Sequence, residues 1–466
     1  MYKEAELKKI FEGKRIMIAG FGREGRSSYK LIRKLFPTPS SSVILAVADK
    51  NWNITTDQLL ADDTELSIFV GDDYLAHSAE YDIILKSPGI PTFDFENIVP
   101  LERVSSQTDI FLKIYGSQTV GITGTKGKST TTNLIYSVLK SNKPDTIMAG
   151  NMGLPLFDIV EEIDSDAVIV LELSSHQLEN IHQGSYIGIV LNLFQEHLDH
   201  YHSYLDYKMA KLNIALCQTP RDVFIYCSDN NELAQLVDDS DIKSIKLSYS
   251  MNNAVDKGCY CDGRYFRMMP GDNIIYDTES QRYVKGVHNL SNCMAVFMVG
   301  HCFGISDQAI AQAISEFKGL EHRLEYVATK SGITFYNDSI STIPEATIAA
   351  VEALKEVDTL ILGGFDRGID YSKLVNFVIG TDVRNIVFVG EAGNRIYNLL
   401  KEGNALQGKN YILSNSYPDI VKWCYANTGE GKICLLSPAA SSYDMFKNFE
   451  ERGRVFKDLV LSRTEK

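Results

Sequence analysis

The sequence lacks the features that mark secreted, membrane-spanning and nucleic-acid-binding proteins. It has 8 cysteines in 466 residues and no Cys-x-x-Cys pair, so we expect reduced thiols rather than a disulfide framework. No apolar run approaches the roughly 20 residues of a membrane span, and the first residues have no apolar signal core. The formal net charge of −14 argues against a surface for nucleic acid or an anionic membrane. The sequence therefore predicts a cytoplasmic protein with neither of those partners.

The pattern along the chain is that of an α/β protein with several domains. Apolar residues make up 44% and charged residues 23%, which is typical of globular proteins. Short apolar runs alternate with helical patterns almost throughout, which indicates βαβ units and mainly parallel sheets. No repeat and no low-complexity tract interrupts this alternation. We expect three domains, at residues 1–116, 117–320 and 321–466.

The most informative segment is residues 121–130, which read Gly-Ile-Thr-Gly-Thr-Lys-Gly-Lys-Ser-Thr. Apolar residues before it predict a short buried strand, and residues 131–139 have helical spacing. A glycine turn between a strand and a helix directs backbone N–H groups and the helix dipole at an anion. Lys128 adds a charge for the β- and γ-phosphates, and the Ser129 hydroxyl can reach Mg²⁺. Although Ile122 replaces the first glycine of the usual P-loop, we predict an ATP site; a fortuitous glycine turn is the alternative.

A second glycine motif follows a predicted strand at residues 15–19 and reads Gly-Phe-Gly-Arg-Glu-Gly. Asp49 ends the next predicted strand, in the place of an acidic ribose partner, although later than the usual spacing of about 20 residues. The predicted strand 83–85 leads into Ser87-Pro88-Gly89, at a position where open α/β sheets bind ligands. These features indicate a site for a nucleotide diphosphate. A tight turn that needs glycine, or an NAD-dependent dehydrogenase, fits the same residues.

The central part also has residues suited to metal ions. The predicted strand 167–173 is apolar except for Glu172, whose burial is costly unless it is paired or bound to a metal. We expect a Mg²⁺ ligand there, with a satisfied core carboxylate as the alternative. The predicted strand 187–193 leads into a loop with three histidines, among them His197. Zinc is disfavoured because no cysteine lies at ligand spacing, so a second hard cation at His197 is preferred.

One lysine of the central part has no special role by its pattern alone. Lys211 falls in a helix predicted over residues 204–216, among apolar neighbours. Such a lysine is expected to extend its charged end into solvent.

The last part of the chain has three polar loops, each after a predicted strand. They begin at Asp338, Gly363 and Ser437, after the predicted strands 333–336, 359–362 and 433–436. Because the carboxyl ends of parallel strands share one edge, we expect these loops to form one rim and a binding site. Any one of them alone could be explained by turn chemistry.

Taken in order, these motifs resemble those of the Mur ligase family over essentially the whole chain. The matching motifs are residues 123–130, Glu172-Leu-Ser-Ser175, Asn192 with His197-Leu-Asp199, Ala210-Lys211-Leu212, His288-Asn289-x-x-Asn292, His322-Arg323 and Asn337-Asp338-Ser339. Within the family, residues 87–89, 172–179 and 437–453 are similar to the members that add glutamate to UDP-N-acetylmuramoyl-L-alanine.

The resemblance implies three domains: a Rossmann-like N-terminal domain for the UDP-sugar, a central ATPase domain of P-loop type, and a Rossmann-like C-terminal domain for the amino acid. It implies a monomeric ligase that uses ATP and Mg²⁺ in peptidoglycan precursor synthesis. ATP would phosphorylate the alanyl carboxylate, and the amine of glutamate, in its D form by resemblance, would displace phosphate.

The resemblance also implies roles for individual residues. Those implied for ATP are Gly124, Thr125, Lys126, Gly127, Lys128, Ser129, Thr130, Asn289, Arg323 and Asp338. Those implied for metal are Ser129, Glu172, His197 and a carbamylated Lys211, and the last three share the catalytic role with Lys128. Those implied for the UDP-sugar are Arg23, Glu24, Asp49, Ser87, Gly89 and Asn151. Those implied for glutamate are Thr342, Arg367, Ser442 and Phe449.

Two departures from the family pattern concern the amino acid. Ile340 and Arg367 stand where the family usually has lysine. Arg367 still suits a carboxylate, but the charge lost at Ile340 leaves ligation with L-glutamate open. A folylpolyglutamate-type ligase, an NAD-dependent dehydrogenase and a non-catalytic nucleotide-binding regulator are three further hypotheses. The dehydrogenase leaves residues 121–130 unexplained, and the retained Lys128 and Glu172 argue against the regulator.

Overall fold

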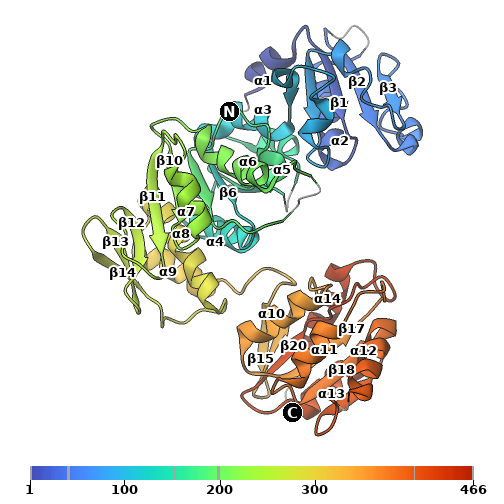
Figure 1. The fold of residues 1–466 in the computed structure, drawn as a ribbon, viewed down its shortest axis with the longest axis vertical. Coiled ribbons are helices and arrows are strands. Elements are labelled where there is room, and N and C mark those ends of the chain that lie inside the picture. The colour runs from blue at the N-terminus through green and yellow to red at the C-terminus, as the bar shows by residue number, and fades with distance from the viewer. Residues whose placement is uncertain (1–2, 39–41, 152–153, 197–199, 404, 464–466) are drawn as a thin grey trace. The chain divides into compact units, whose positions relative to one another are not determined.

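The computed structural model describes residues 3–38, 42–151, 154–196, 200–403 and 405–463. Within these ranges the strands form three sheets of five, nine and six strands, with helices on their faces (Figure 1). The residues group into two compact units, Met1–Ser280 with Leu290–Ile314, and Gln281–Asn289 with Ser315–Lys466. The first unit contains the five- and nine-stranded sheets, and the second contains the six-stranded sheet. The three domain limits expected from the sequence stay a prediction.

The five-stranded sheet is parallel throughout and has the strand order β3-β2-β1-β4-β5. Its strands are β1 (Arg15–Ala19), β2 (Ile44–Asp49), β3 (Ser67–Val70), β4 (Ile83–Lys86) and β5 (Val104–Ser105). The helices of this part are α1 (Glu4–Phe11), α2 (Arg23–Leu35) and α3 (Gln107–Tyr115). The strand order reverses between β1 and β4. The loops after these two strands therefore meet at the switch point, where open α/β sheets bind ligands.

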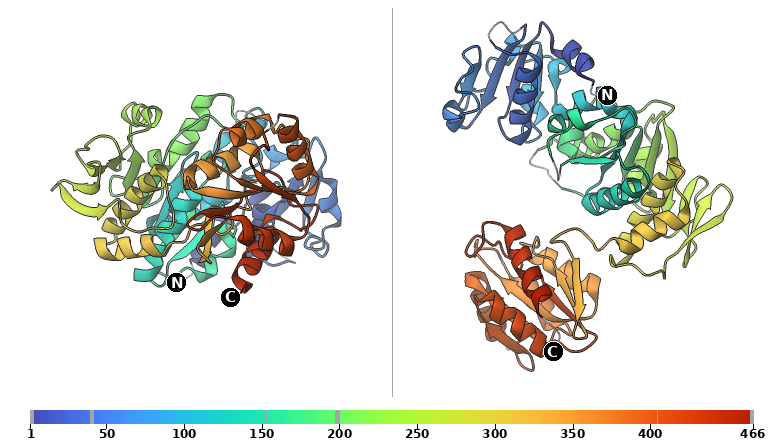
Figure 2. Two further views of the ribbon diagram at one scale, coloured as in Figure 1. Left: turned by 90° about the horizontal axis from the view of Figure 1, so that it is seen from below. Right: turned by 180° about the vertical axis from the view of Figure 1, so that it is seen from behind.

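The nine-stranded sheet has the order β14-β13-β12-β11-β10-β9-β6-β8-β7. Its strands are β6 (Thr119–Thr123), β7 (Ile147–Gly150), β8 (Ile169–Glu172), β9 (Ile187–Val190), β10 (Val223–Cys227), β11 (Ile245–Ser250), β12 (Gly258–Cys261), β13 (Tyr265–Met269) and β14 (Asn273–Asp277). The helices that follow these strands are α4 (Lys128–Asn142), α5 (Ser175–Leu178), α6 (Tyr204–Leu216), α7 (Asn231–Asp238), α8 (Val287–Cys302) and α9 (Asp307–Glu316). Strands β6 to β12 pair in parallel, whereas β12, β13 and β14 pair antiparallel at the edge of the sheet (Figure 2).

The six-stranded sheet has the order β15-β16-β20-β17-β18-β19, and only its β15–β16 pair is antiparallel. Its strands are β15 (Glu325–Lys330), β16 (Ile333–Asn337), β17 (Val357–Gly363), β18 (Asn385–Val389), β19 (Asn410–Leu413) and β20 (Ile433–Leu436). Its helices are α10 (Pro344–Leu354), α11 (Ser372–Ile379), α12 (Gly390–Glu402), α13 (Tyr417–Asn427) and α14 (Phe449–Ser462). Leu360 and Leu362 pack in one core with α10, α11 and α12, and Ile361 packs in another with α13 and α14. Both faces of β17 are therefore covered by helices, as expected for a mainly parallel sheet.

The α/β class and the mainly parallel sheets predicted from the sequence are confirmed. The antiparallel pairing of the hairpins β12–β14 and of the edge strand β15 was not predicted from the sequence. Short edge strands with polar residues on one face carry a weak pattern, and so the sequence does not reveal them. All eight cysteines lie in the described part of the chain and are free thiols. No helix in the described ranges is both long and apolar enough to cross a membrane.

Candidate active site

The phosphate loop lies between the end of β6 and the start of α4, as the sequence predicted. Gly124 and Gly127 have φ angles of +150° and +84°, which favour glycine. Asn192 fastens the loop from the neighbouring strand: its Oδ1 accepts hydrogen bonds from the backbone N–H groups of Thr125 at 3.1 Å and Lys126 at 2.8 Å. Asn192 matched the family pattern, but no site role was assigned to it from the sequence. Asn192 thus holds the loop in a conformation that leaves the other backbone N–H groups of the loop at the N-terminal, positive end of α4.

Two lysines converge on one carbonyl oxygen of this loop. The Nζ atoms of Lys128 and Lys211 donate to the Gly124 oxygen at 2.9 and 3.0 Å. Lys211 is only 2% exposed, so the expectation of a solvated side chain is wrong. Residues 207, 210, 211 and 214 of α6 are all buried, and the short apolar pattern of the sequence did not reveal this burial. Burial, and secondarily the charge of Lys128, lowers the pKa of Lys211 to about 7.

Glu172 lies at the end of β8, opposite Ile122 of β6, and is 3% exposed. Its Oε1 accepts a hydrogen bond from Asn151 Nδ2 at 3.0 Å. Its Oε2 is buried and has no hydrogen-bond partner among the described residues, and the same is true of Thr123 Oγ1. Two buried oxygens without a partner beside a phosphate loop are a donor set that fits Mg²⁺, which prefers oxygen ligands. The predicted metal ligand His197 lies outside the described residues, as do Leu198 and Asp199.

Five of the six predicted UDP-sugar residues lie on the elements at the carboxyl edge of the five-stranded sheet, whereas Asn151 follows β7 of the nine-stranded sheet and bonds to Glu172. The Asp49 carboxylate accepts the backbone N–H groups of Phe21 at 2.6 Å and Asn51 at 2.8 Å, so it fastens the glycine turn after β1. The Ser87 hydroxyl donates to the Gly20 carbonyl at 2.9 Å, across the two neighbouring strand ends. A Cβ on Gly20 would lie 2.7 Å from the Ser87 side chain, so glycine is required there. Arg23 and Gly89 are exposed at the same edge of the sheet.

Glu24 links this edge to the central sheet. Its Oε1 accepts a hydrogen bond from Gln177 Nε2 at 2.9 Å, and its Oε2 is buried without a hydrogen-bond partner among the described residues. Burial raises the pKa of this carboxyl, although Gln177 and Lys86 act in the opposite direction. Gln177 was not predicted as a site residue, although it lies five positions after Glu172 in a matched motif. It connects the first part of the site with the strand that carries the expected metal ligand.

The three polar loops of the second unit form one rim, as their positions predicted. The Arg367 guanidinium donates to the Thr342 carbonyl at 3.1 Å. Backbone bonds join Phe365 N to the Ser441 oxygen at 2.9 Å and Gly363 N to the Pro438 oxygen at 2.7 Å. The loops after β16, β17 and β20 are therefore tied together. Arg367 is exposed above them, whereas Ser442 is buried.

Asp338 lies beneath this rim and is 2% exposed. Its carboxylate accepts the Ser437 hydroxyl at 2.7 Å and the Leu324 N–H at 3.1 Å. Burial raises the pKa of Asp338 to about 6, and these hydrogen bonds limit the rise. Arg323 is exposed nearby, and Asn289 Nδ2 donates to the Lys285 carbonyl at 2.7 Å within the same unit.

A buried arginine that was not predicted as a site residue supports two of these loops. Arg452 on α14 donates to the Ser339 hydroxyl at 2.9 Å and the Ser339 carbonyl at 2.7 Å. It also donates to the carbonyls of Ala440 and Ser441 at 3.1 and 3.2 Å. The Ser339 hydroxyl in turn donates to the carbonyl of Phe449, which begins α14. Arg452 lies in a segment that matches the family, and that match was the signal that could have identified it as a supporting residue. Its burial could not be expected from residue type, because charged residues are seldom fully buried.

Comparisons with known proteins show what this chain is similar to in sequence. The family described as the Mur ligase middle domain matches residues 122–300. A UDP-N-acetylmuramoylalanine--D-glutamate ligase from Desulfitobacterium hafniense (strain Y51) is 32% identical over 461 residues, which cover 96% of this chain and 97% of that protein. The protein of the same name from Clostridioides difficile (strain 630) is 31% identical over 456 residues, which cover 96% and 98%.

The fold also has solved counterparts. The structure of MurF ligase from Thermotoga maritima in complex with ADP is similar with a TM-score of 0.53 at 16% identity, over 100% of this chain and 98% of that one. This likeness concerns the fold, whereas the two relatives match nearly their whole length in sequence. The chain therefore belongs to the Mur ligase family.

Proposed function

We propose that this chain is the ATP-dependent ligase that joins D-glutamate to UDP-N-acetylmuramoyl-L-alanine, with ADP and phosphate as products, in peptidoglycan precursor synthesis. The observation that carries the proposal is the near full-length similarity to relatives with that name, on a chain that has the phosphate loop of residues 121–130 with Lys128. The residues at the switch point of the first sheet supply a site for a nucleotide sugar. The enzyme acts in the cytoplasm as a monomer.

The first step is phosphoryl transfer to the substrate carboxylate. An oxygen of the alanyl carboxylate attacks the γ-phosphorus of ATP, the bond from that phosphorus to the β–γ bridging oxygen breaks, and ADP leaves. The N–H groups of residues 124–130 hold the phosphates at the start of α4, and Lys128 offsets the charge on the β- and γ-phosphates. When bound, Mg²⁺ neutralises charge between the phosphates. Ser129 and Glu172 are the described residues that would hold it.

The second step is attack by the amino acid. The glutamate amine attacks the acyl carbon, the bond to the phosphate oxygen breaks, phosphate leaves, and the nitrogen loses a proton. Arg367 is suited to one carboxylate of the incoming dicarboxylate through its two-pronged geometry, and Thr342 and Ser442 supply neutral donors for the other. Phe449 at the start of α14 borders the same rim. Arg323, Asn289 and Asp338 are proposed to contact ATP from the second unit.

Lys211 is proposed to work as a carbamate. With its pKa lowered to about 7, about half of the amine is neutral at pH 7, and only the neutral amine adds CO₂. The addition forms an N–C bond and releases one proton, and it changes a cation beside Lys128 into an anion. This removes the repulsion between two positive charges. The carbamate oxygens and His197 would then be ligands for a second cation. The geometry thus favours the modification that the family resemblance implies.

The test is a ligation assay with the purified protein, ATP, UDP-N-acetylmuramoyl-L-alanine and a panel of amino acids, with products resolved by mass. The proposal requires one new amide product with D-glutamate and equal amounts of ADP and phosphate. A product with L-glutamate alone would move the assignment to the L isomer, which Ile340 leaves open. No product with any amino acid, from a folded protein that binds ATP, would refute the proposed function.

A further inference from the structure

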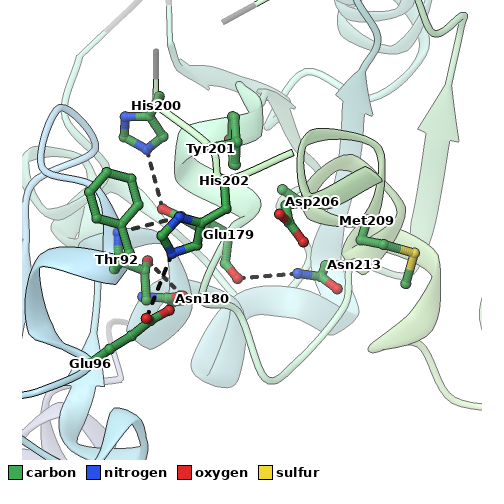
Figure 3. Close-up of a pocket in the computed structure, with 12 residues that line it drawn as sticks. Thr92, Glu96, Glu179, Asn180, His200, Tyr201, His202, Asp206, Met209 and Asn213 are labelled. Atoms are coloured by element: carbon green, nitrogen blue, oxygen red, sulfur yellow. Dashed lines mark hydrogen bonds and ion pairs between the residues drawn. The ribbon is translucent and has the colours of Figure 1, made fainter. Parts of the chain in front are cut away.

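A buried ion pair connects the first sheet to the central part of the first unit. Lys86, the last residue of β4, has a side chain only 1% exposed, and its Nζ lies 2.9 Å from Glu179 Oε2. His200 contacts the same carboxylate oxygen, with Nε2 at 3.4 Å from Glu179 Oε2 (Figure 3). Burial would raise the pKa of Glu179, but hydrogen bonds from His200 and Lys86 lower it to about 2, so it is an anion at neutral pH. We call Lys86, Glu179 and His200 the junction cluster.

The junction cluster touches the predicted substrate turn directly. Lys86 immediately precedes Ser87-Pro88-Gly89, and its Nζ also donates to the Ile90 carbonyl at 2.7 Å, so the ammonium group closes the turn from both ends. Glu179 receives a third contact, from the Thr92 N–H to its Oε1 at 3.4 Å. The turn is therefore held by charge-assisted bonds at residues 86, 90 and 92.

The other side of the junction cluster belongs to the catalytic half of the unit. Glu179 directly follows α5, the helix that comes after the strand with Glu172. Asn213 on α6 donates to the Glu179 carbonyl at 3.2 Å, and α6 carries Lys211 two residues earlier. The backbone around Glu179 is thus fixed to the two elements that carry the proposed metal ligand and the proposed carbamate.

Apolar packing does not replace these bonds at this place. A cavity of about 240 Å³ lies beside Glu179, between Thr92 and Glu96 of the first part and Asp206 and Met209 of α6. Figure 3 shows these side chains around an open space, with Glu179 at its wall. The junction cluster therefore contributes buried, charge-assisted contacts between the turn and the central part, beside the Thr92–Asn180 hydrogen bond and the half-exposed Glu96–His202 ion pair.

We propose that the junction cluster is a positioning device that sets the substrate turn against the phosphate loop, so that the carboxylate of the bound nucleotide sugar meets the γ-phosphate of ATP. Lys86, Glu179 and His200 are positioning residues, because they act through the turn and through α6. The inference rests on the proposed function for the identity of the substrate. The family motifs imply no role for any of these three residues.

The charges of the cluster predict a specific order of effects. Lys86→Met keeps the buried aliphatic part of the side chain and removes the ammonium group. The turn then loses the ion pair with Glu179 and the hydrogen bond to the Ile90 carbonyl. Glu179→Gln leaves the Lys86 ammonium buried without an anion, which is more disruptive than losing both charges. The double variant Lys86→Met/Glu179→Gln should therefore work better than Glu179→Gln alone. Simple loss of contacts would make the double variant the worst of the three.

The experiment measures the KM of each substrate and kcat for the full chain and these variants. A displaced turn should raise the KM for the UDP-sugar, lower kcat, or both, by roughly 10- to 100-fold in kcat/KM. The KM values for ATP and glutamate should stay within twofold. The matched control is Lys34→Met, which removes an exposed ion pair between α2 and Glu161, joining the same two parts of the chain away from the turn. It should leave all constants unchanged.

Equal changes in all three KM values, or wild-type constants in Lys86→Met, would overturn the inference. If Lys86→Met does not fold, His200→Gln, which keeps the ion pair, decides the matter. This variant should raise the KM for the UDP-sugar by about three- to tenfold, as expected for one lost hydrogen bond. The KM values for ATP and glutamate should not change. Failure of the proposed function is distinguishable, because the wild-type chain would then form no ligation product in the same assay.

Discussion

Lys211 is a buried amine with no ion pair to a described residue, and its removal has a calculable effect on stability. Its pKa is lowered from 10.5 to about 7, chiefly by burial. Between these values the unfolded chain binds more protons than the folded one, so stability rises with pH across that window. At 1.36 kcal/mol per pKa unit, the lysine costs about 5 kcal/mol at pH 6 and about 2 kcal/mol at pH 9. Lys211→Met should therefore stabilise the region around α6, by about 3 kcal/mol more at pH 6 than at pH 9.

Hydrogen exchange of β6 and α6, read by mass spectrometry in CO₂-free buffer, measures this free energy locally in a chain with several domains. Lys208→Met, a half-buried lysine on the same helix, is the control and should give no such pH-dependent gain. Addition of ¹³C-bicarbonate should produce a carbamate carbon signal in the wild type that Lys211→Met lacks. A gain that is equal at pH 6 and pH 9 would refute the reasoning, because it would mean that the amine keeps an ordinary pKa.

Three further predictions concern the reaction. Lys128→Ala should reduce turnover by roughly 100-fold or more, because it removes the charge beside the phosphates. The control Lys140→Ala, at the far end of α4, should keep normal turnover. Phosphate release measures the turnover of both variants. With the UDP-sugar and ATP but no amino acid, hydroxylamine should trap a hydroxamate of the alanyl group, and detection of AMP with pyrophosphate would instead mean an adenylate. The choice between D- and L-glutamate should be sharp, because a site that leaves one carboxylate unpaired rejects that isomer by about 1–3 kcal/mol, and the family similarity predicts that the D isomer is used. Separate incubations with each isomer decide this, and turnover with neither would contradict the glutamate assignment.

The parts of the fold that the sequence predicted are those with strong, local patterns. Strands β1, β6, β16 and β20 are apolar runs bounded by glycine or polar turns, and α6 has clear helical spacing. The hairpins β12–β14 have mixed polar and apolar residues, and their pairing depends on contacts with neighbouring strands rather than on their own pattern. Their antiparallel direction was therefore not predictable from the alternation of elements.

The candidate site was predictable where a backbone motif creates it and not where burial creates it. The glycine loop and the rim of three polar loops follow from residue type and position after a strand. The burial of Lys211 and of Arg452 depends on which helix face packs against the sheet, and a single lysine or arginine in a helix does not show this. The Lys86–Glu179 pair joins residues far apart in the sequence, so only the three-dimensional structure could identify it.

The buried Arg452 has a consequence for engineering the amino-acid preference of this protein. Its guanidinium bonds only to main-chain carbonyls and one hydroxyl among the described residues, in two loops that come from different parts of the sequence. A loop taken from another ligase brings different carbonyl positions to this fixed cation. To change the amino-acid preference, residues 338–342, residues 437–442 and the first turns of α14 therefore have to be exchanged together. The new loops then present their carbonyl groups in positions that suit the buried arginine.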